Sequence, residues 1–167
     1  QYSGPGFPND QAWGIHVDSS GADEKLVVLG SGPAKKVASG TQRVDNDRYV
    51  VRVKASDGSV DPDFNGGAPY TFNTGGTFSD GGRRGIVEKD GTIISCGYTN
   101  FGEGLGNHVI LLRLRPNGTP DPAFGFGISL PGVARFNPFV DDGGVAECYQ
   151  VGRQSNGRYV TTGYGRA

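Results

Sequence analysis

The apolar residues of this chain occur in short runs that are bounded by glycine, asparagine and aspartate. The runs are rich in β-branched residues, and none continues with a helical period long enough to form a helix. This pattern predicts an all-β protein built from short strands. The expected strands include residues 26–29, 49–53, 70–72, 92–94, 109–114, 128–130 and 159–161.

The same pattern occurs twice, about sixty positions apart. Residues 57–66 return as residues 117–126, with the glycine, the Asp-Pro pair and the phenylalanine in register. A fixed period of this kind is typical of stacked supersecondary units, none of which buries its apolar face alone. The chain is therefore expected to be a repeat protein.

Each repeat consists of two half-units. The first predicts two strands joined by a turn, and its second strand runs into a glycine. The second half-unit predicts an outgoing strand, an Asp-Gly or Asn-Gly turn, the Asp-Pro-X-Phe sequence and a last strand. Asp-Gly and Asn-Gly favour a type I′ turn, which needs φ > 0 at both central positions. The turns of the first half-units are Ser20-Gly21, Asp90-Gly91 and Asn156-Gly157.

A full unit is a four-stranded antiparallel meander, which is the blade of a β-propeller. We predict one repeat domain over residues 1–167, with repeat 1 at about 10–79, repeat 2 at about 80–141 and a half repeat at 142–167. About two and a half blades are incomplete alone, because propellers typically need about four to eight. The half repeat offers an assembly edge at Tyr159, Val160, Thr161 and Tyr164.

The composition and charge of the chain argue against several classes of binding partner. The net charge is -1 and the basic residues are dispersed, which argues against nucleic acid. No apolar stretch approaches the roughly 20 residues of a membrane-spanning helix. The chain has no methionine and starts at Gln1, so we expect a segment of a larger propeller or assembly. The expected partner is another protein chain or further copies of this one.

Residues 89–97 and 113–125 resemble the bacterial delta-60 repeat, in which a DGKILVAG-like strand precedes an RLNPDGSLDTSFG-like turn. Residues 52–66 resemble it too, and residues 154–164 match its first part. The resemblance implies a propeller-like array in large exported or surface bacterial proteins that mostly lack an assigned activity. It therefore implies an extracellular, cell-surface or periplasmic location. The chain departs from the pattern in two long inserts, 31–48 and 99–107.

Cys96 and Cys148 are the only cysteines. In the repeat alignment, Cys96 ends the second strand of one blade and Cys148 approaches the first strand of the next. This favours a disulfide between neighbouring blades over two separate buried thiols. Closing that loop would contribute roughly 3–4 kcal/mol in the chain-entropy model.

Asp57, Asp61 and Asp63 surround the first Asp-Pro-X-Phe turn. Closely spaced carboxylates are the ligands that calcium prefers, so these residues are the candidate metal site. The second copy keeps only Asp121 of the three. The plainer interpretation is that the conserved position of the turn, Asp61 or Asp121, braces its own backbone, as aspartate does in Asx-turns. No other cofactor is predicted.

Four residues are candidates for ligand binding: Trp13, Tyr98, Phe101 and His108. Aromatic residues at the rim of a propeller can stack on sugars, although packing between blades is the simpler role for Trp13. His108 and His16 fit ordinary strand or rim positions. The sequence has no nucleophile elbow, zinc-binding His pair or phosphate loop, so no catalytic residue is predicted.

We therefore expect a non-enzymatic, exported repeat module that acts in structural assembly or protein interaction by completing a propeller. One alternative is a calcium-dependent or carbohydrate-binding module that uses the two inserts as its rim. Another alternative is an accessory domain of a larger secreted enzyme.

Overall fold

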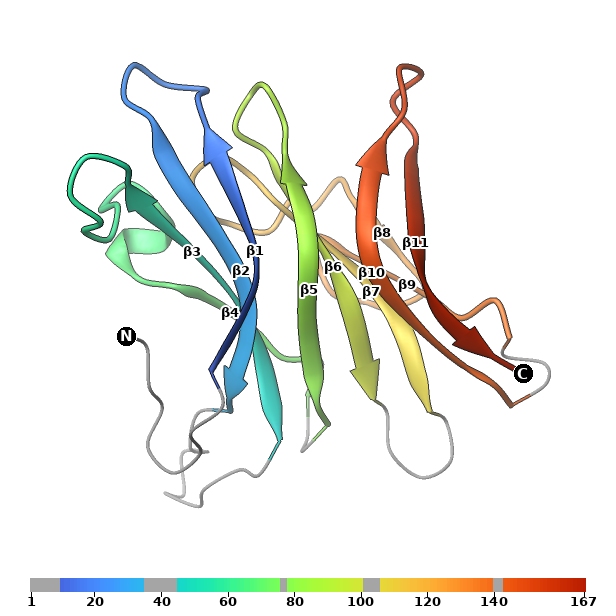
Figure 1. Cartoon of the computed structure of the whole chain (residues 1–167). Helices are drawn as coiled ribbons and strands as arrows, with labels where there is room; N and C mark the ends of the chain where they lie inside the picture. The colour runs from blue at the N-terminus through green and yellow to red at the C-terminus, as the bar shows by residue number, and fades with distance from the viewer. Residues whose placement is uncertain (1–9, 35–44, 76–77, 101–105, 140–142) are drawn as a thin grey trace.

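The computed structural model describes residues 10–34, 45–75, 78–100, 106–139 and 143–167. These residues form three twisted β-sheets that follow one another along the chain (Figure 1). The all-β, propeller-like architecture predicted from the sequence is confirmed, and the described sheets do not close a ring. No helix among the described segments is long and apolar enough to cross a membrane.

The first sheet is a four-stranded antiparallel meander in the order β1-β2-β3-β4. Its two long central strands pair residue by residue from Lys25↔Lys54 to Pro33↔Asn46. The predicted insert 31–48 is therefore shorter than expected, because both of its ends extend these strands. The strands are β1 (Gln11–Asp18), β2 (Lys25–Pro33), β3 (Asn46–Lys54) and β4 (Tyr70–Phe72), and a 3₁₀ turn covers Asn65–Gly67.

The second sheet repeats this meander and adds one short strand, in the order β5-β6-β7-β9-β8. The last two strands pair in parallel, which the antiparallel prediction did not include. The insert predicted at 99–107 is also shorter than expected, since Thr99, Asn100 and Asn107 belong to strands. The strands are β5 (Asp80–Val87), β6 (Ile93–Asn100), β7 (Asn107–Leu114), β8 (Gly125–Phe126) and β9 (Val133–Phe136).

The third sheet contains two described strands, β10 (Val145–Arg153) and β11 (Tyr159–Arg166). Within the described part of the chain, β11 is paired with β10 on one side only. The corresponding strands β2 and β6 are each paired on both sides. The third sheet is therefore the half-blade that the sequence predicted.

The prediction of a strand at residues 128–130 is wrong. Residues 127–130 form a bend, and the outer strand begins later, at Val133. Gly127 and Gly132 have φ of 74° and 75°, so they interrupt the extended backbone on both sides of the run. Ile128 and Leu130 still pack against the core between the first two sheets, which explains their apolar character.

The predicted hairpin turns are in place, but they are not of type I′. In the Asp-Gly and Asn-Gly turns only the glycines have positive φ, with values of 73° to 84°, whereas type I′ requires it at the preceding residue too. Instead, the side-chain oxygen of that Asp or Asn accepts the N–H two residues later. The acceptor–donor pairs are Asp57–Ser59, Asp90–Thr92, Asn117–Thr119 and Asn156–Arg158. In the predicted Ser20-Gly21 turn, Gly21 does not have positive φ.

The core has two layers, one in each space between neighbouring sheets. Val27, Leu29 and Val50 of the first sheet pack on Ile93 and Leu112 of the second. On the other side of the second sheet, a second cluster joins it to β10. The central members of the second cluster are Ile94, Cys96, Leu111, Ala146, Cys148 and Val151. Each sheet thus buries apolar side chains against its neighbour.

Candidate functional site

The first sheet carries an apolar face on the side away from the second sheet. The strand register aligns two cross-strand rows on this face, Ile15–Val28–Val51 and Val17–Leu26–Val53. Ile15 is 63 % exposed and Val17 is 55 % exposed. We call these six residues the open face.

The second sheet has the same face in a buried state. Its corresponding row is Val87–Ile93–Leu114, aligned by the same register. Ile93 and Leu114 are fully buried, and the row lies in the core shared with the first sheet. The repeat therefore shows what covers an open face, namely the opposite side of another blade.

The opposite side of the third sheet is also exposed. Val160 and Tyr164 of β11 are 46 % and 45 % exposed. Tyr159 and Thr161, the other two predicted edge residues, alternate with them and are half-buried. Tyr159 packs edge-on against Phe124 and donates a hydrogen bond to Glu88 at 2.8 Å, so its side chain contacts the second repeat and not an outside partner.

A buried arginine locks the first blade. Arg52 pairs with Asp61 at 2.7 Å and with Asp18 at 3.0 Å, and its guanidinium lies 5.1 Å from the ring centre of Phe64. It also donates to the carbonyl oxygen of Pro116, in the turn of the second blade. We call Arg52, Asp61 and Phe64 the first latch.

The second blade repeats these residues as Arg113, Asp121 and Phe124, which form the second latch. Arg113 lies 3.4 Å from Asp121 and 5.9 Å from the ring centre of Phe124. Its side chain is 27 % exposed, against 7 % for Arg52. The second latch therefore has the same residue types, but its arginine is more exposed to solvent than that of the first latch.

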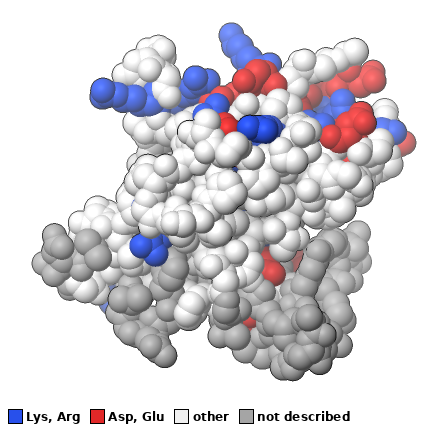
Figure 2. All heavy atoms as spheres, turned by 180° about the vertical axis from the view of Figure 1, so that it is seen from behind, with Lys and Arg blue, Asp and Glu red and all other residues white. Residues whose placement is uncertain are grey.

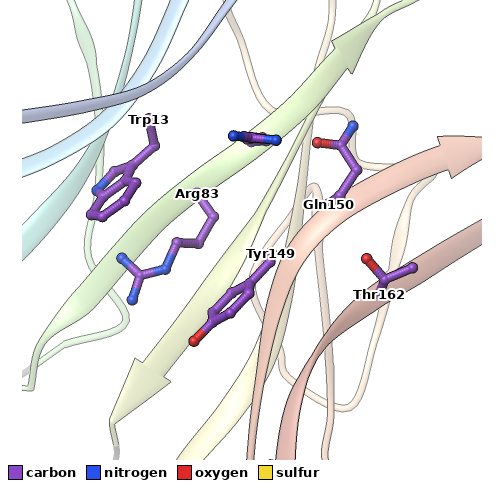
Figure 3. Close-up of a pocket in the computed structure, with 6 residues that line it drawn as sticks. Trp13, Arg83, Tyr149, Gln150 and Thr162 are labelled. Atoms are coloured by element: carbon purple, nitrogen blue, oxygen red, sulfur yellow. The ribbon is translucent and has the colours of Figure 1, made fainter.

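The first strands of the three sheets share a β-bulge at the same place. The register shifts at Trp13 in β1, at Arg83 and Arg84 in β5, and at Tyr149 in β10. Since β5 lies between β1 and β10, these bulged side chains meet in one groove of about 440 Å³. The groove is lined by Trp13, Arg83, Arg84, Tyr149, Gln150 and Thr162 (Figure 3).

A glycine stands opposite each bulge, at the end of the apolar run that the sequence shows in each first half-unit. A Cβ atom on Gly30, Gly97 or Gly163 would overlap the carbonyl oxygen of Gln11, Gly81 or Glu147, respectively. The paired strand needs glycine here because the bulged backbone approaches it so closely. Sequence reasoning missed the bulges, although this glycine was their signal.

Arg83 holds the middle of the groove. Its guanidinium lies 4.7 Å from the ring centre of Trp13, 5.1 Å from that of Tyr98 and 5.6 Å from that of Tyr149. It also pairs with Glu147 at 3.0 Å. Figure 3 shows Arg83 between Trp13 and Tyr149. One cation therefore orders three aromatic rings.

Of the predicted ligand-binding residues, Trp13 lines the groove and Tyr98 contacts its central arginine. His108 lies on β7 opposite Thr99 of β6, and Phe101 falls outside the described residues. Arg83, Arg84 and Tyr149 were not predicted, because only the bulges and the stacking of the sheets bring them together.

Two of the three predicted metal residues, Asp57 and Asp61, have carboxylates that are engaged by other groups. Asp61 pairs with Arg52 and accepts the N–H of Asp63, and Asp57 accepts from Ser59. Asp121 accepts the N–H of Ala123 in the same way. Across the described segments, no three His, Cys, Asp or Glu residues form a group that could hold a metal ion.

A disulfide joins Cys96 of β6 to Cys148 of β10, with the Cα atoms 5.6 Å apart. Both residues are buried in the layer between the second and third sheets. The half-blade is thus covalently attached to the complete blade before it.

Another buried charge lies between the first two sheets. Arg48 is fully buried, donates to the carbonyl oxygen of Gly81 and lies over the ring of Phe72. Burial lowers the pKa of Arg48 to about 10, although the nearby Asp80 carboxylate opposes this shift. Burial also raises the pKa of Asp80, against the hydrogen bonds from Thr74.

The charges on the rear face gather at one end of the molecule, where the hairpin turns lie (Figure 2). Both signs are mixed there, and the middle of this face is largely uncharged. This distribution differs from the single-sign patch that nucleic-acid binding requires.

One family model matches the chain. Residues 88–124 match a β-propeller domain of unknown function, DUF5122. The matched segment runs from the β5–β6 turn to Phe124 and covers less than a quarter of the chain. It supports a propeller-type repeat family. No curated protein matches this chain.

Proposed function

We propose that this chain is a non-enzymatic assembly module that associates through its sheet faces with further blades of the same repeat type, supplied by a second copy. The observation that carries the proposal is the open face. Six aliphatic side chains are aligned there, and in the second sheet the row equivalent to Val17–Leu26–Val53 has Ile93 and Leu114 fully buried and Val87 packed against the same core.

The partner surface is the exposed side of the half-blade. In the first two sheets, the corresponding side carries Val27 or Ile94 and covers the face of the next sheet. In the half-blade, it carries Val160 and Tyr164. Docking the open face of one copy there would continue the blade order head to tail and remove apolar surface from water.

The setting proposed for this assembly is outside the cytoplasm. The resemblance to exported delta-60 repeats supports it, as does the Cys96–Cys148 disulfide, since disulfides persist in oxidising compartments.

Analytical ultracentrifugation of two charged variants tests the proposal. Val17→Lys blocks the open face and Val160→Lys blocks the half-blade, so each variant alone is expected to be monomeric. Mixed in equal amounts, they form a heterodimer, because each supplies the face that the other has lost. Ser155→Lys adds a charge on an exposed turn outside both faces and associates like the wild type.

A wild-type chain that stays monomeric at about 100 μM would contradict the proposal, since a specific interface is expected to have a tighter Kd. So would variants that remain monomeric when mixed.

A further inference from the structure

We propose that the groove binds a carboxylated sugar, of the hexuronic acid class, with the sugar packed on the ring surface that Arg83 leaves free at Trp13 and Tyr149 and with Arg84 paired with its carboxylate. The groove lies outside the open face, and it borders the exposed side of the half-blade only at Thr162. Its test uses the binding of a small ligand, so its failure is distinguishable from failure of the assembly role.

The aromatic rings are ordered but accessible. Trp13 and Tyr149 are 43 % and 47 % exposed, and both contact Arg83. Because Arg83 also pairs with Glu147, which accepts a further hydrogen bond from Asn107 at 2.6 Å, its position is fixed. Rigid rings with free surface suit the apolar C–H face of a sugar ring, since little entropy is lost on binding.

The two arginines of the groove differ in their charge balance. Glu147 neutralises Arg83, whereas Arg84 has no carboxylate within ion-pairing distance in the described parts of the chain. The groove therefore offers one uncompensated positive charge beside two aromatic rings. A single charge fits a monocarboxylate better than a polyphosphate, which requires a cluster of cations.

Polar groups complete the lining. The side-chain nitrogen of Gln150 donates to the carbonyl oxygens of Gly85 and Val151, which orients the amide and leaves its oxygen as an acceptor for a hydroxyl. Thr162 adds a hydroxyl from the neighbouring strand. A volume of about 440 Å³ lies in the range of small-molecule sites, which is roughly 300–1,000 Å³.

The groove has its own reporter, because Trp13 is the only tryptophan. The test is a fluorescence titration of the whole chain with trigalacturonate, with a neutral galactose trimer and triglutamate as comparison ligands. We expect a saturable change with trigalacturonate that weakens as salt is added.

Two variants assign the roles. Arg84→Gln should weaken trigalacturonate binding about ten-fold or more, as expected for losing a charge-assisted hydrogen bond, and leave binding of the neutral trimer unchanged. Tyr149→Ala should weaken both ligands. Arg158→Gln removes an exposed arginine from the β10–β11 turn and is the matched control. Circular dichroism confirms that each variant is folded.

Three results would overturn the proposal. The first is no change in Trp13 fluorescence with 10 mM trigalacturonate at low salt. The second is equal binding of the neutral trimer, which would remove the role of Arg84. The third is equal binding of triglutamate, which would show recognition of a carboxylate without a sugar.

Discussion

The first and second latches use the same three residue types in two different environments. The first latch, Arg52 with Asp61 and Phe64, is covered by the turn of the second blade, whose Pro116 carbonyl accepts from Arg52. The second latch, built on Arg113, is partly exposed. The difference shows that a blade of this repeat is completed by the blade that follows it.

The second blade covers the first latch through backbone contacts as well as through the hydrogen bond from Arg52. The N–H of Asn65 donates to the carbonyl oxygen of Asn117 at 2.8 Å, and a Cβ atom on Gly118 would collide with the ring of Phe64. The turn residues of one blade are therefore also interface residues for the preceding blade. This gives the Asn-Gly pair a second role beyond turn formation.

Replacing the latch arginines should have the largest effect. Arg52→Met leaves Asp18 and Asp61 buried without a cation, which is expected to cost about 3–5 kcal/mol of unfolding free energy. Arg113→Met, the matched change in the second latch, should cost about 1 kcal/mol or less because its ion pair is partly exposed. Urea unfolding measures both. Equal losses would show that the cover does not matter.

Removing the disulfide tests how the half-blade is held. The variant with Cys96→Ala and Cys148→Ala should lose roughly 3–4 kcal/mol, because the bridge closes a long loop. Hydrogen exchange should rise mainly in β10 and β11, while β2 and β3 keep their protection. A uniform rise over all three sheets would indicate that the half-blade is not a separate weak point.

A single methyl group tests the bulges. Gly97→Ala places a Cβ atom against the carbonyl oxygen of Gly81 and should cost about 1–3 kcal/mol. Gly21→Ala is the control, since its nearest neighbour would be the Nζ atom of Lys25 at 3.8 Å. Its unfolding free energy should stay within about 0.5 kcal/mol of wild type. A tolerated Gly97→Ala would contradict the close approach seen here.

The smallest effect concerns Tyr159. Burial, followed by the hydrogen bond to Glu88, raises its pKa from 10.0 to about 12. Between these pH values the unfolded chain loses the proton while the folded chain keeps it, so this stabilisation is present below pH 10 and lost toward pH 12. Tyr159→Phe should therefore be less stable by about 1 kcal/mol at pH 8, and the difference should shrink by pH 11.5. A constant difference would contradict the assignment.

Local pattern was sufficient to predict the strands of the blades and their turns. The runs 26–29 and 109–112 lie in β2 and β7, since β-branched and aliphatic residues bounded by turn residues leave few alternatives. The pattern failed at 128–130, where apolar residues pack on the core without forming a strand. The apolar residues there indicate burial, whereas the flanking glycines determine the backbone conformation.

The groove could not be predicted in the same way. Trp13, Arg83 and Tyr149 are far apart in the sequence and meet only because three equivalent bulges lie on neighbouring strands. The glycine opposite each bulge is visible in the sequence, but its effect depends on a close backbone approach in the folded sheet. Trp13 alone was accessible to prediction, as an aromatic residue near the start of a blade.

The central contact between the blades is the one by which the following blade covers the latch of the preceding one. Solvent exchange of the arginine Nε–H protons, followed by NMR at pH 6, tests it directly. The Nε–H of Arg52, which donates to Asp61 at 2.7 Å, should exchange at least ten times more slowly than that of Arg113. The Arg113 Nε atom is buried, but it has no hydrogen-bond partner among the described residues, and its side chain is 27 % exposed. Equal exchange rates at the two arginines would contradict the account.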